Sequence, residues 1–210
     1  MTANQGDDDQ AAHQFPDWRQ IYYDQPVESM PWYSPALDED LAAWLDRLRI
    51  SSGRALDLGT GPGTQAIELA RRGFQVTASD LSEEAVRLAA ETAAAAGVVV
   101  DWRQDDLLAT QLTGPFDLIF DRGCFHVLPP ERRLDYLQTV ANWLAPGGRL
   151  LLKCFSRAQP GEQGPHRFTP EQIRELFGKL LTVESVEETM FQGTLDPPPR
   201  ALFCVMRSRQ

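Results

Sequence analysis

The chain has 210 residues, 42% of them hydrophobic, and this length suits one domain with a sizeable core. Its 30 acidic and 20 basic residues give a net charge of −10, which disfavours a nucleic-acid partner because no basic stripe offsets it. No apolar run approaches the roughly 20 residues of a membrane helix, no signal peptide is recognisable, and the three scattered cysteines indicate neither a disulfide framework nor a metal site. We therefore expect a cytoplasmic protein, monomeric, that acts on small molecules without a metal.

The first part of the chain divides into a polar leader and an aromatic segment. Residues 1–14 are polar and acidic and are predicted to be disordered. Residues 15–35 are rich in aromatic side chains, and a short helix over 16–24 places Trp18 and Tyr22 on one face. This segment, which also includes Trp32, is either a clasp that packs on the sheet or a lid over cofactor and substrate.

From residue 36 onward the pattern alternates between helices and apolar strands, which predicts a single α/β domain over residues 15–210. The last two strands follow one another without a helix between them and are expected to pair antiparallel. A long loop, 156–169, is expected to be functional because compact domains rarely contain such loops otherwise. The predicted strands are 54–58, 74–80, 98–102, 116–120, 150–155, 183–189 and 201–207. The predicted helices are 36–50, 65–72, 83–96, 131–144 and a short one that begins at residue 170.

The most informative stretch is the glycine-rich loop after the first of these strands. It reads Asp57-Leu58-Gly59-Thr60-Gly61-Pro62-Gly63 and leads directly into a helix. Strand, glycine loop and helix form the opening unit of a nucleotide-binding α/β domain. The glycines allow a sharp turn and a close approach of a ligand to the backbone.

Charge decides which ligand this loop suits. A carboxylate at Asp57 would repel a pyrophosphate by a few kcal/mol at an effective dielectric of about 20, and the loop contains no cation before Arg71. A ligand with an ammonium group and no phosphate fits better, and S-adenosylmethionine (AdoMet) is such a ligand. The pattern Asp-x-Gly-x-Gly-x-Gly resembles motif I of the class I AdoMet-dependent methyltransferases.

Acidic residues follow the next two strands. Asp80 ends the second strand about twenty residues after the glycine loop, where a carboxylate accepts hydrogen bonds from ribose hydroxyls; its alternative role is to cap the following helix. Asp106 is preferred over Asp105 as acceptor of the adenine amino group, because the family pattern places a Gly-Asp pair here. A plain turn is the alternative for this segment.

The second half of the chain narrows the resemblance. Asp121-Arg122-Gly123 at the fourth strand and Gly164-Pro165-His166-Arg167-Phe168 after the fifth are similar to thiopurine S-methyltransferases. Trp18-x3-Tyr22 and Pro31-Trp32 resemble the plant halide and thiol methyltransferases, and the tellurite-resistance methyltransferases are further relatives. The resemblance implies a doubly wound, Rossmann-like sheet of seven strands in the order 3-2-1-4-5-7-6, with AdoMet converted to S-adenosylhomocysteine.

The resemblance also implies the reaction and its residues. Methyl transfer to a soft nucleophile (thiol, halide or chalcogen anion) by in-line displacement needs alignment more than a general base. Arg122 is expected to bind an anionic substrate, its alternative being a salt bridge, and His126 is a candidate base whose alternative is a packed, structural histidine. Methyl transfer to oxygen or nitrogen with His126 or His166 as base, a nicotinamide-dependent reductase and a non-enzymatic AdoMet-binding regulator remain alternatives. The predicted cofactor contacts are Trp18, Tyr22, Trp32, Asp57, Gly59, Thr60, Gly61, Gly63, Asp80, Leu81, Asp106, Leu107 and Asp121.

Overall fold

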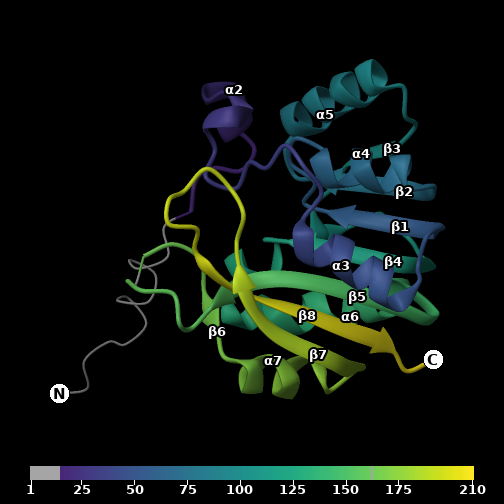
Figure 1. Cartoon of the computed structure of the whole chain (residues 1–210), viewed down its shortest axis with the longest axis vertical. Coiled ribbons are helices and arrows are strands. Elements are labelled where there is room, and N and C mark those ends of the chain that lie inside the picture. The colour runs from purple at the N-terminus through teal and green to yellow at the C-terminus, as the bar shows by residue number, and fades with distance from the viewer. Residues whose placement is uncertain (1–14, 162) are drawn as a thin grey trace.

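A computed structural model of the protein describes residues 15–161 and 163–210, so the predicted leader lies outside the described residues. Its strands are β1 (Gly53–Leu58), β2 (Phe74–Asp80), β3 (Asp101–Gln104), β4 (Phe116–Arg122), β5 (Leu144–Ser156), β6 (Arg167–Phe168), β7 (Leu181–Met190) and β8 (Arg200–Ser208). They form one sheet in the order β3-β2-β1-β4-β5-β8-β7, with the short β6 beside β5 (Figure 1). Only the β5–β8 and β7–β8 pairs are antiparallel. The predicted α/β class and strand order are confirmed.

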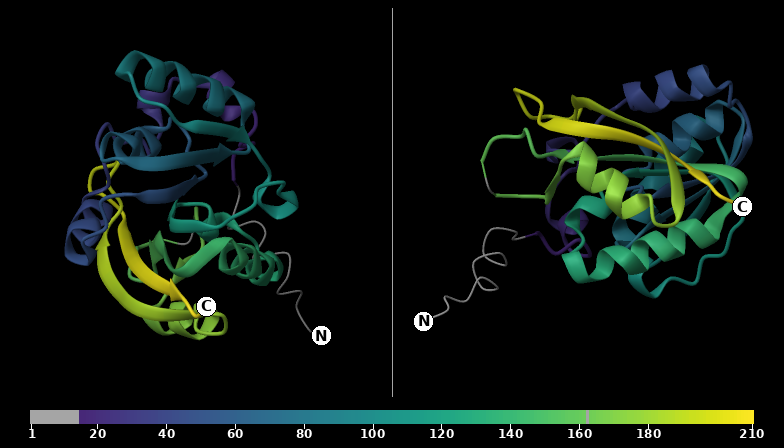
Figure 2. Two further views of the ribbon diagram at one scale, coloured as in Figure 1. Left: turned by 90° about the vertical axis from the view of Figure 1, so that its right-hand side faces the viewer. Right: turned by 90° about the horizontal axis from the view of Figure 1, so that it is seen from below.

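Helices cover both faces of this sheet (Figure 2). Alternate residues of β1 face opposite sides of the sheet. Ala55 packs with residues of the helices at 39–48 and 64–71, whereas Leu56 and Leu58 pack with residues of the helices at 133–143 and 170–177. The helices are α2 (Ile21–Asp24), α3 (Glu39–Leu48), α4 (Thr64–Arg71), α5 (Glu83–Ala96), α6 (Arg133–Trp143) and α7 (Pro170–Phe177). Single 3-10 turns are η1 (Val27–Ser29), η2 (Leu107–Ala109), η3 (Phe125–Val127) and η4 (Pro130–Arg132).

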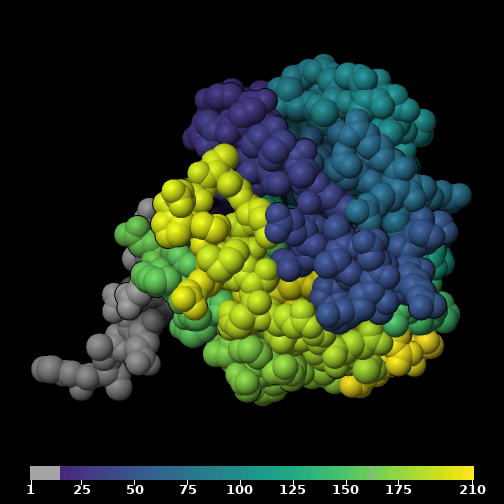
Figure 3. Space-filling model, viewed as in Figure 1, coloured from purple at the N-terminus to yellow at the C-terminus, as the bar shows by residue number. Residues whose placement is uncertain are grey.

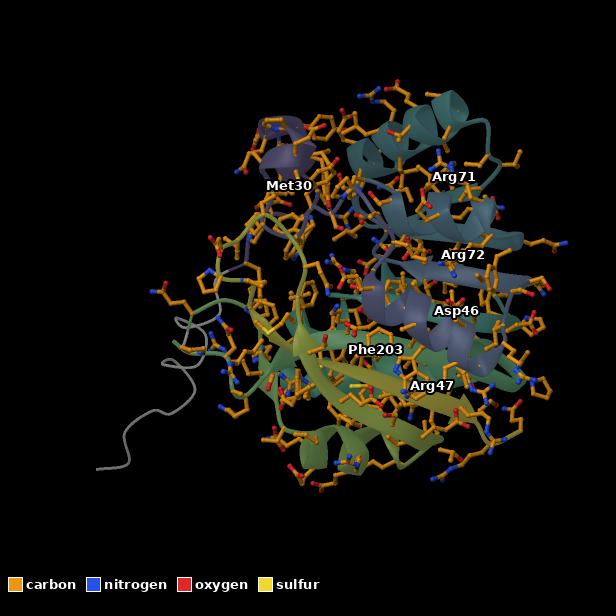
Figure 4. All side chains as sticks on the ribbon, viewed as in Figure 1. Met30, Asp46, Arg47, Arg71, Arg72 and Phe203 are labelled. Carbon is orange, nitrogen blue, oxygen red and sulfur yellow. The ribbon has the colours of Figure 1, made fainter. Side chains whose placement is uncertain are left out.

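Side-chain caps explain where several helices begin. The carboxylate of Asp38 accepts from the backbone N–H groups of Asp40 and Leu41 at the start of α3. Ser82 caps α5, and Thr169 forms a reciprocal capping box with Gln172 at the start of α7. Figure 4 labels Asp46 and Arg72, whose ion pair of 3.5 Å joins α3 to the end of α4.

Several predicted boundaries are wrong. The helix expected over 16–24 spans only Ile21–Asp24, so Trp18 precedes it, and the helix expected over 36–50 spans Glu39–Leu48. Strand boundaries differ for local reasons. The strand expected at 98–102 begins only at Asp101, because the Val98 N–H closes the end of α5 by bonding to the Ala93 carbonyl. β4 continues two residues past 120, to Arg122. β5 begins at Leu144 rather than 150, since the Pro-Gly-Gly segment predicted to end the preceding helix is an irregularity within the β4–β5 pairing.

The same edge of the sheet receives the carboxyl ends of β1, β2, β4 and β5, and two further segments lie against each other beside it. These are residues 15–38 and the loop 191–199 between β7 and β8, which adjoin in Figure 3. Thr194 donates its backbone N–H to the Pro31 carbonyl at 3.1 Å and its hydroxyl to the Met30 carbonyl at 3.2 Å. Met30, labelled in Figure 4 beside α2, is fully buried. In residues 15–161 and 163–210, no helix is long and apolar enough to cross a membrane.

Candidate active site

The glycine loop is shaped by contacts with two other parts of the chain. Gly59 and Gly61 have positive φ angles of 65° and 51°. A Cβ atom on Gly59 would lie 2.0 Å from the Cys124 Sγ, and one on Gly61 would lie 2.7 Å from the Tyr22 hydroxyl. Only glycine combines this backbone with these neighbours. At Gly59 and Gly61 the loop therefore presents backbone atoms, without side chains, to the adjoining cavity.

Asp80 joins the loop to the end of β2. Its carboxylate accepts the backbone N–H of Gly61 and that of Ser82, each at 2.9 Å. Each carboxylate oxygen can accept more than one hydrogen bond, so both keep capacity for a ligand hydroxyl. Burial raises the pKa of Asp80, although the backbone donors oppose the rise.

Asp57, the acidic residue before the loop, is almost completely buried. It accepts the Thr60 hydroxyl at 2.5 Å. Burial raises the pKa of Asp57 to about 7, the negative charges of Asp80 and Asp121 add to the rise, and the Thr60 hydrogen bond opposes it. A cationic ligand group beside this carboxylate would favour its ionised form.

A cavity of about 1190 Å³ opens at this edge of the sheet. Asp57 and Asp80 lie on the glycine-loop side, whereas the cationic residues Arg122 and Arg167 come from other elements. This distribution fits a ligand with a positive charge near the loop and opposes a pyrophosphate there. Eleven of the predicted site residues line the cavity together with Arg122 and His126: Trp18, Tyr22, Trp32, Asp57, Gly59, Thr60, Gly61, Asp80, Leu81, Asp106 and Leu107.

Two predicted cofactor contacts, Gly63 and Asp121, are outside the lining. Gly63 is the N-cap of α4, and a Cβ there would lie 2.7 Å from the Ala89 Cβ, so glycine allows close packing against α5. Asp121 accepts hydrogen bonds from the backbone N–H groups of residues 123, 124 and 125 and from the Tyr136 hydroxyl. Asp121 therefore shapes the loop after β4, and its predicted cofactor contact stays a prediction.

The two acids after β3 both line the cavity, but their hydrogen bonds differ. Asp106 caps η2 through the Leu108 N–H at 3.0 Å, and Arg19 approaches it at 3.8 Å. Asp105 uses one oxygen to accept the Gln111 N–H, and its buried Oδ2 has no hydrogen-bond partner in the described part of the chain. An unpartnered buried oxygen makes Asp105 as good an acceptor for a ligand amino group as the predicted Asp106.

Arg122 does not present a free guanidinium to the cavity. Its Nε pairs with the Asp38 carboxylate at 3.0 Å, Nη1 donates to the Trp32 carbonyl at 2.9 Å, and Nη2 donates to the Gln192 carbonyl. The side chain is 9% exposed, and its guanidinium lies 4.7 Å from the centre of the Phe191 ring. Its donors are thus engaged by internal partners, with Asp38 as the ion-pair partner, and direct substrate binding by Arg122 stays a prediction.

His126 lies at the cavity with its two ring nitrogens in different surroundings. Nδ1 accepts the Phe155 backbone N–H at 3.2 Å, so the neutral ring carries its proton on Nε2. The described residues provide no hydrogen-bond partner for Nε2, and the ring lines the cavity. Burial, with the charges of His166 and Arg122, lowers the pKa of His126 to about 3. A histidine in this state donates a hydrogen bond and is a poor general base.

Aromatic side chains form much of the cavity wall. Trp18 and Trp32 meet edge to face with ring centres 5.5 Å apart, and Trp32 Nε1 donates to the Tyr22 hydroxyl at 3.3 Å. Phe155 and Phe191, 5.5 Å apart, were missed by sequence analysis. The only sequence signal for them was their place at strand ends, which says nothing about which way a side chain points.

Comparisons with known proteins agree with this geometry. Residues 55–148 match the model of the family described as "Methyltransferase domain". The 2-heptyl-1-hydroxyquinolin-4(1H)-one methyltransferase of Mycobacteroides abscessus is 33% identical over 138 residues, which cover 64% of this chain and 61% of that protein. The thiopurine S-methyltransferase of Legionella pneumophila (strain Paris) is 26% identical over 203 residues, 89% of each chain. A solved structure entitled "Conversion of a Disulfide Bond into a Thioacetal Group during Echinomycin Biosynthesis" superposes with a TM-score of 0.78, at 24% identity, over 90% of this chain and 91% of that one.

The sheet order and the glycine loop are those of a Rossmann-like α/β domain, and residues 55–148 match a methyltransferase family model. The similarity covers the part of the chain that contains the glycine loop, and the two relatives named above are methyltransferases. It spans about three fifths of the Mycobacteroides relative and most of the thiopurine S-methyltransferase.

Proposed function

We propose that this protein transfers the methyl group of AdoMet to a small soft nucleophile, and that the nucleophile is a thiol on an apolar body. The observation that carries the proposal is one cavity with two unlike halves. The half beside the glycine loop contains Asp57 and Asp80, and the other half is walled by aromatic rings, including Phe155 and Phe191. The first suits a charged, hydroxylated cofactor, and the second suits an apolar acceptor.

Within this proposal each cofactor group has a place. Asp57 and the loop backbone hold the methionine part, Asp80 the ribose hydroxyls, and Asp105 or Asp106 the adenine amino group. Trp18, Tyr22 and Trp32 cover the methionine end, where aromatic faces favour a cation. AdoMet supplies a methyl group already activated by its sulfonium charge.

The protein contributes to the reaction by aligning the acceptor with the methyl group and by excluding water from the cavity. The aromatic wall excludes water, which leaves a bound thiolate poorly solvated and therefore reactive. His126 lines the cavity, and we propose that its Nε2–H orients the acceptor anion. A halide or an oxyanion would lose strong hydration in such a site with few donors to replace it, so these acceptors are ranked below thiols.

Methylation of oxygen or nitrogen is the second candidate, because the Mycobacteroides relative carries the name of a hydroxyquinolinone methyltransferase. It requires a base for an acceptor that is not already ionised. His126 is engaged at Nδ1 and its pKa is low, and His166 is not among the residues that line the cavity. These observations favour the thiol.

A panel of acceptors tests the proposal. Purified protein would be incubated with AdoMet and, in turn, aromatic thiols, alkyl thiols, iodide, tellurite, phenols and amines, with release of S-adenosylhomocysteine as the readout. We expect the highest kcat/KM for an aromatic thiol. Turnover of a phenol or amine alone would refute the thiol assignment, and cofactor binding without any turnover would favour an AdoMet-binding regulator. We also propose a monomer in a reducing compartment, consistent with three free cysteines.

A further inference from the structure

A buried cation that the reaction does not use lies behind the aromatic wall. Lys153 of β5 is fully buried. Its Nζ bonds to the Asp38 carboxylate at 2.8 Å, to the Asp40 carboxylate at 2.6 Å and to the Gln192 side-chain oxygen. A lysine without such partners would be very unfavourable at this depth. The ammonium group of Lys153 is therefore fixed in place by its partners, and so is its contact with Gln192.

Arg122 shares the same carboxylate. Asp38 Oδ2 accepts from both Lys153 Nζ and Arg122 Nε, so two cations face the two carboxylates of Asp38 and Asp40. The formal charges of these four groups cancel. A buried cluster of this kind resists rearrangement, because removal of one member leaves an uncompensated charge in the interior.

The cluster joins two segments that are far apart in the sequence. Arg122 donates to the carbonyls of Trp32 and Gln192, and Lys153 reaches the Gln192 side chain. The Trp32 and Phe191 rings line the cavity from these two segments, and the loop adds Leu195. Figure 3 shows the two segments in contact. One set of charges thus anchors both parts of the wall.

We infer that Lys153 and Arg122 are positioning residues, which hold the loop 191–199 against the segment around Trp32 and so complete the acceptor side of the cavity. Neither needs to touch the acceptor. The inference rests on the proposed function only for its kinetic readout, since docking of the loop is a property of the protein alone. It differs from the expectation that Arg122 binds an anionic substrate directly.

Three variants separate this role from others. Lys153→Met removes the buried charge at similar length, and Arg122→Lys keeps a charge but replaces a fork of several donors by one ammonium group. Arg149→Met is the matched control, because Arg149 lies on the same strand and pairs with Glu184 at 2.8 Å away from the cavity. Arg149 is absent from the cavity lining.

Two measurements apply to each variant: KM for the acceptor against kcat, and the rate of chymotrypsin cleavage after Phe191 or Leu195. We expect Lys153→Met to raise the acceptor KM about tenfold, because a wall displaced by about 1 Å is enough for losses of this order or more. Arg122→Lys should show a smaller rise and Arg149→Met none. Loop cleavage should become several-fold faster in the same order, since a loop released from its anchors opens more often.

The outcomes are distinct. Unchanged loop cleavage in Lys153→Met and Arg122→Lys would overturn the inference, whatever the activity. A large rise in KM for the Arg122 variant with an unaltered Lys153→Met would instead restore a direct substrate contact. Lower thermal stability with normal KM and normal cleavage would reduce the cluster to a stabilising one and also overturn the inference. If the wild type methylates no acceptor, the proposed function fails, and the cleavage rates still decide the positioning role.

Discussion

Replacement of Asp57 by asparagine should make the stability of the ligand-free protein less dependent on pH. The carboxylate is fully buried, and its pKa is raised from 3.8 to about 7. Below pH 3.8 the folded and unfolded chains both carry the proton. Between 3.8 and 7 the unfolded chain releases it while the folded chain retains it, so stability falls as pH rises through this window.

The magnitude follows from the size of the shift. A rise of about three pKa units corresponds to a loss of about 4 kcal/mol above pH 7, compared with acid conditions in which both states are protonated. Somewhat less than half of this loss of stability has occurred by pH 5. The free energy of unfolding therefore falls by about 2–3 kcal/mol between pH 5 and pH 8. The Asp57→Asn variant retains the shape and an acceptor for the Thr60 hydroxyl but has no proton that titrates in this range.

Urea unfolding of both proteins at pH 5 and pH 8 measures this difference, and other titrating groups largely cancel in the comparison. We expect the variant to gain about 2–3 kcal/mol on the wild type between the two pH values, and to bind AdoMet more weakly because it has lost the charge beside the loop. If the difference in unfolding free energy between wild type and variant stays constant with pH, the reasoning that burial raises the pKa of Asp57 is refuted.

Three further predictions concern the same cavity. Asp80→Asn should weaken AdoMet binding about 10- to 100-fold, since charged hydrogen bonds to the ribose are lost; an unchanged Kd by calorimetry would contradict its role. Gly59→Ala should cost about 2 kcal/mol or more in stability, because its Cβ would lie 2.0 Å from the Cys124 Sγ. Adding Cys124→Ala should recover part of that loss in thermal unfolding, and no recovery would place the strain elsewhere. His126→Gln should keep the shape of the pH–rate profile, and an inflection that disappears near neutral pH would make the histidine a base.

The sequence predicted the parts of the fold that depend on local pattern. Apolar periodicity gave the order of strands and helices, and glycine spacing located the cofactor loop. Asp80 was found because its distance along the chain from that loop is set by one helix and one strand. These features depend on residues close to one another in the sequence.

Strand geometry explains why Asp121 and Arg122 make internal contacts that sequence analysis did not predict. Sequence analysis ended the strand at residue 120, whereas it continues to Arg122. Side chains alternate along a strand, so Asp121 shares the face of Ile119 and reaches Tyr136, and Arg122 shares the face of Phe120 and reaches Asp38. The two added strand residues therefore each gain internal partners on opposite faces of the sheet.

The aromatic wall and its anchors could not be derived from local pattern at all. Lys153 and Asp38 are 115 positions apart, and Arg122 and Gln192 are 70 apart. Only the antiparallel return of β8 beside β5 brings the loop 191–199 to the cavity. Lys153 in a predicted buried strand was the one available signal, since a lysine there requires buried partners.

The most direct test of the account uses an acceptor that offers two nucleophiles on one ring, 4-mercaptophenol. The protein would be incubated with this compound and AdoMet, and the product would be identified by mass spectrometry and NMR. The account predicts the S-methyl product, with the hydroxyl left free, because the cavity aligns a soft nucleophile and its histidine, His126, is a poor base. The O-methyl ether as the main product would contradict it.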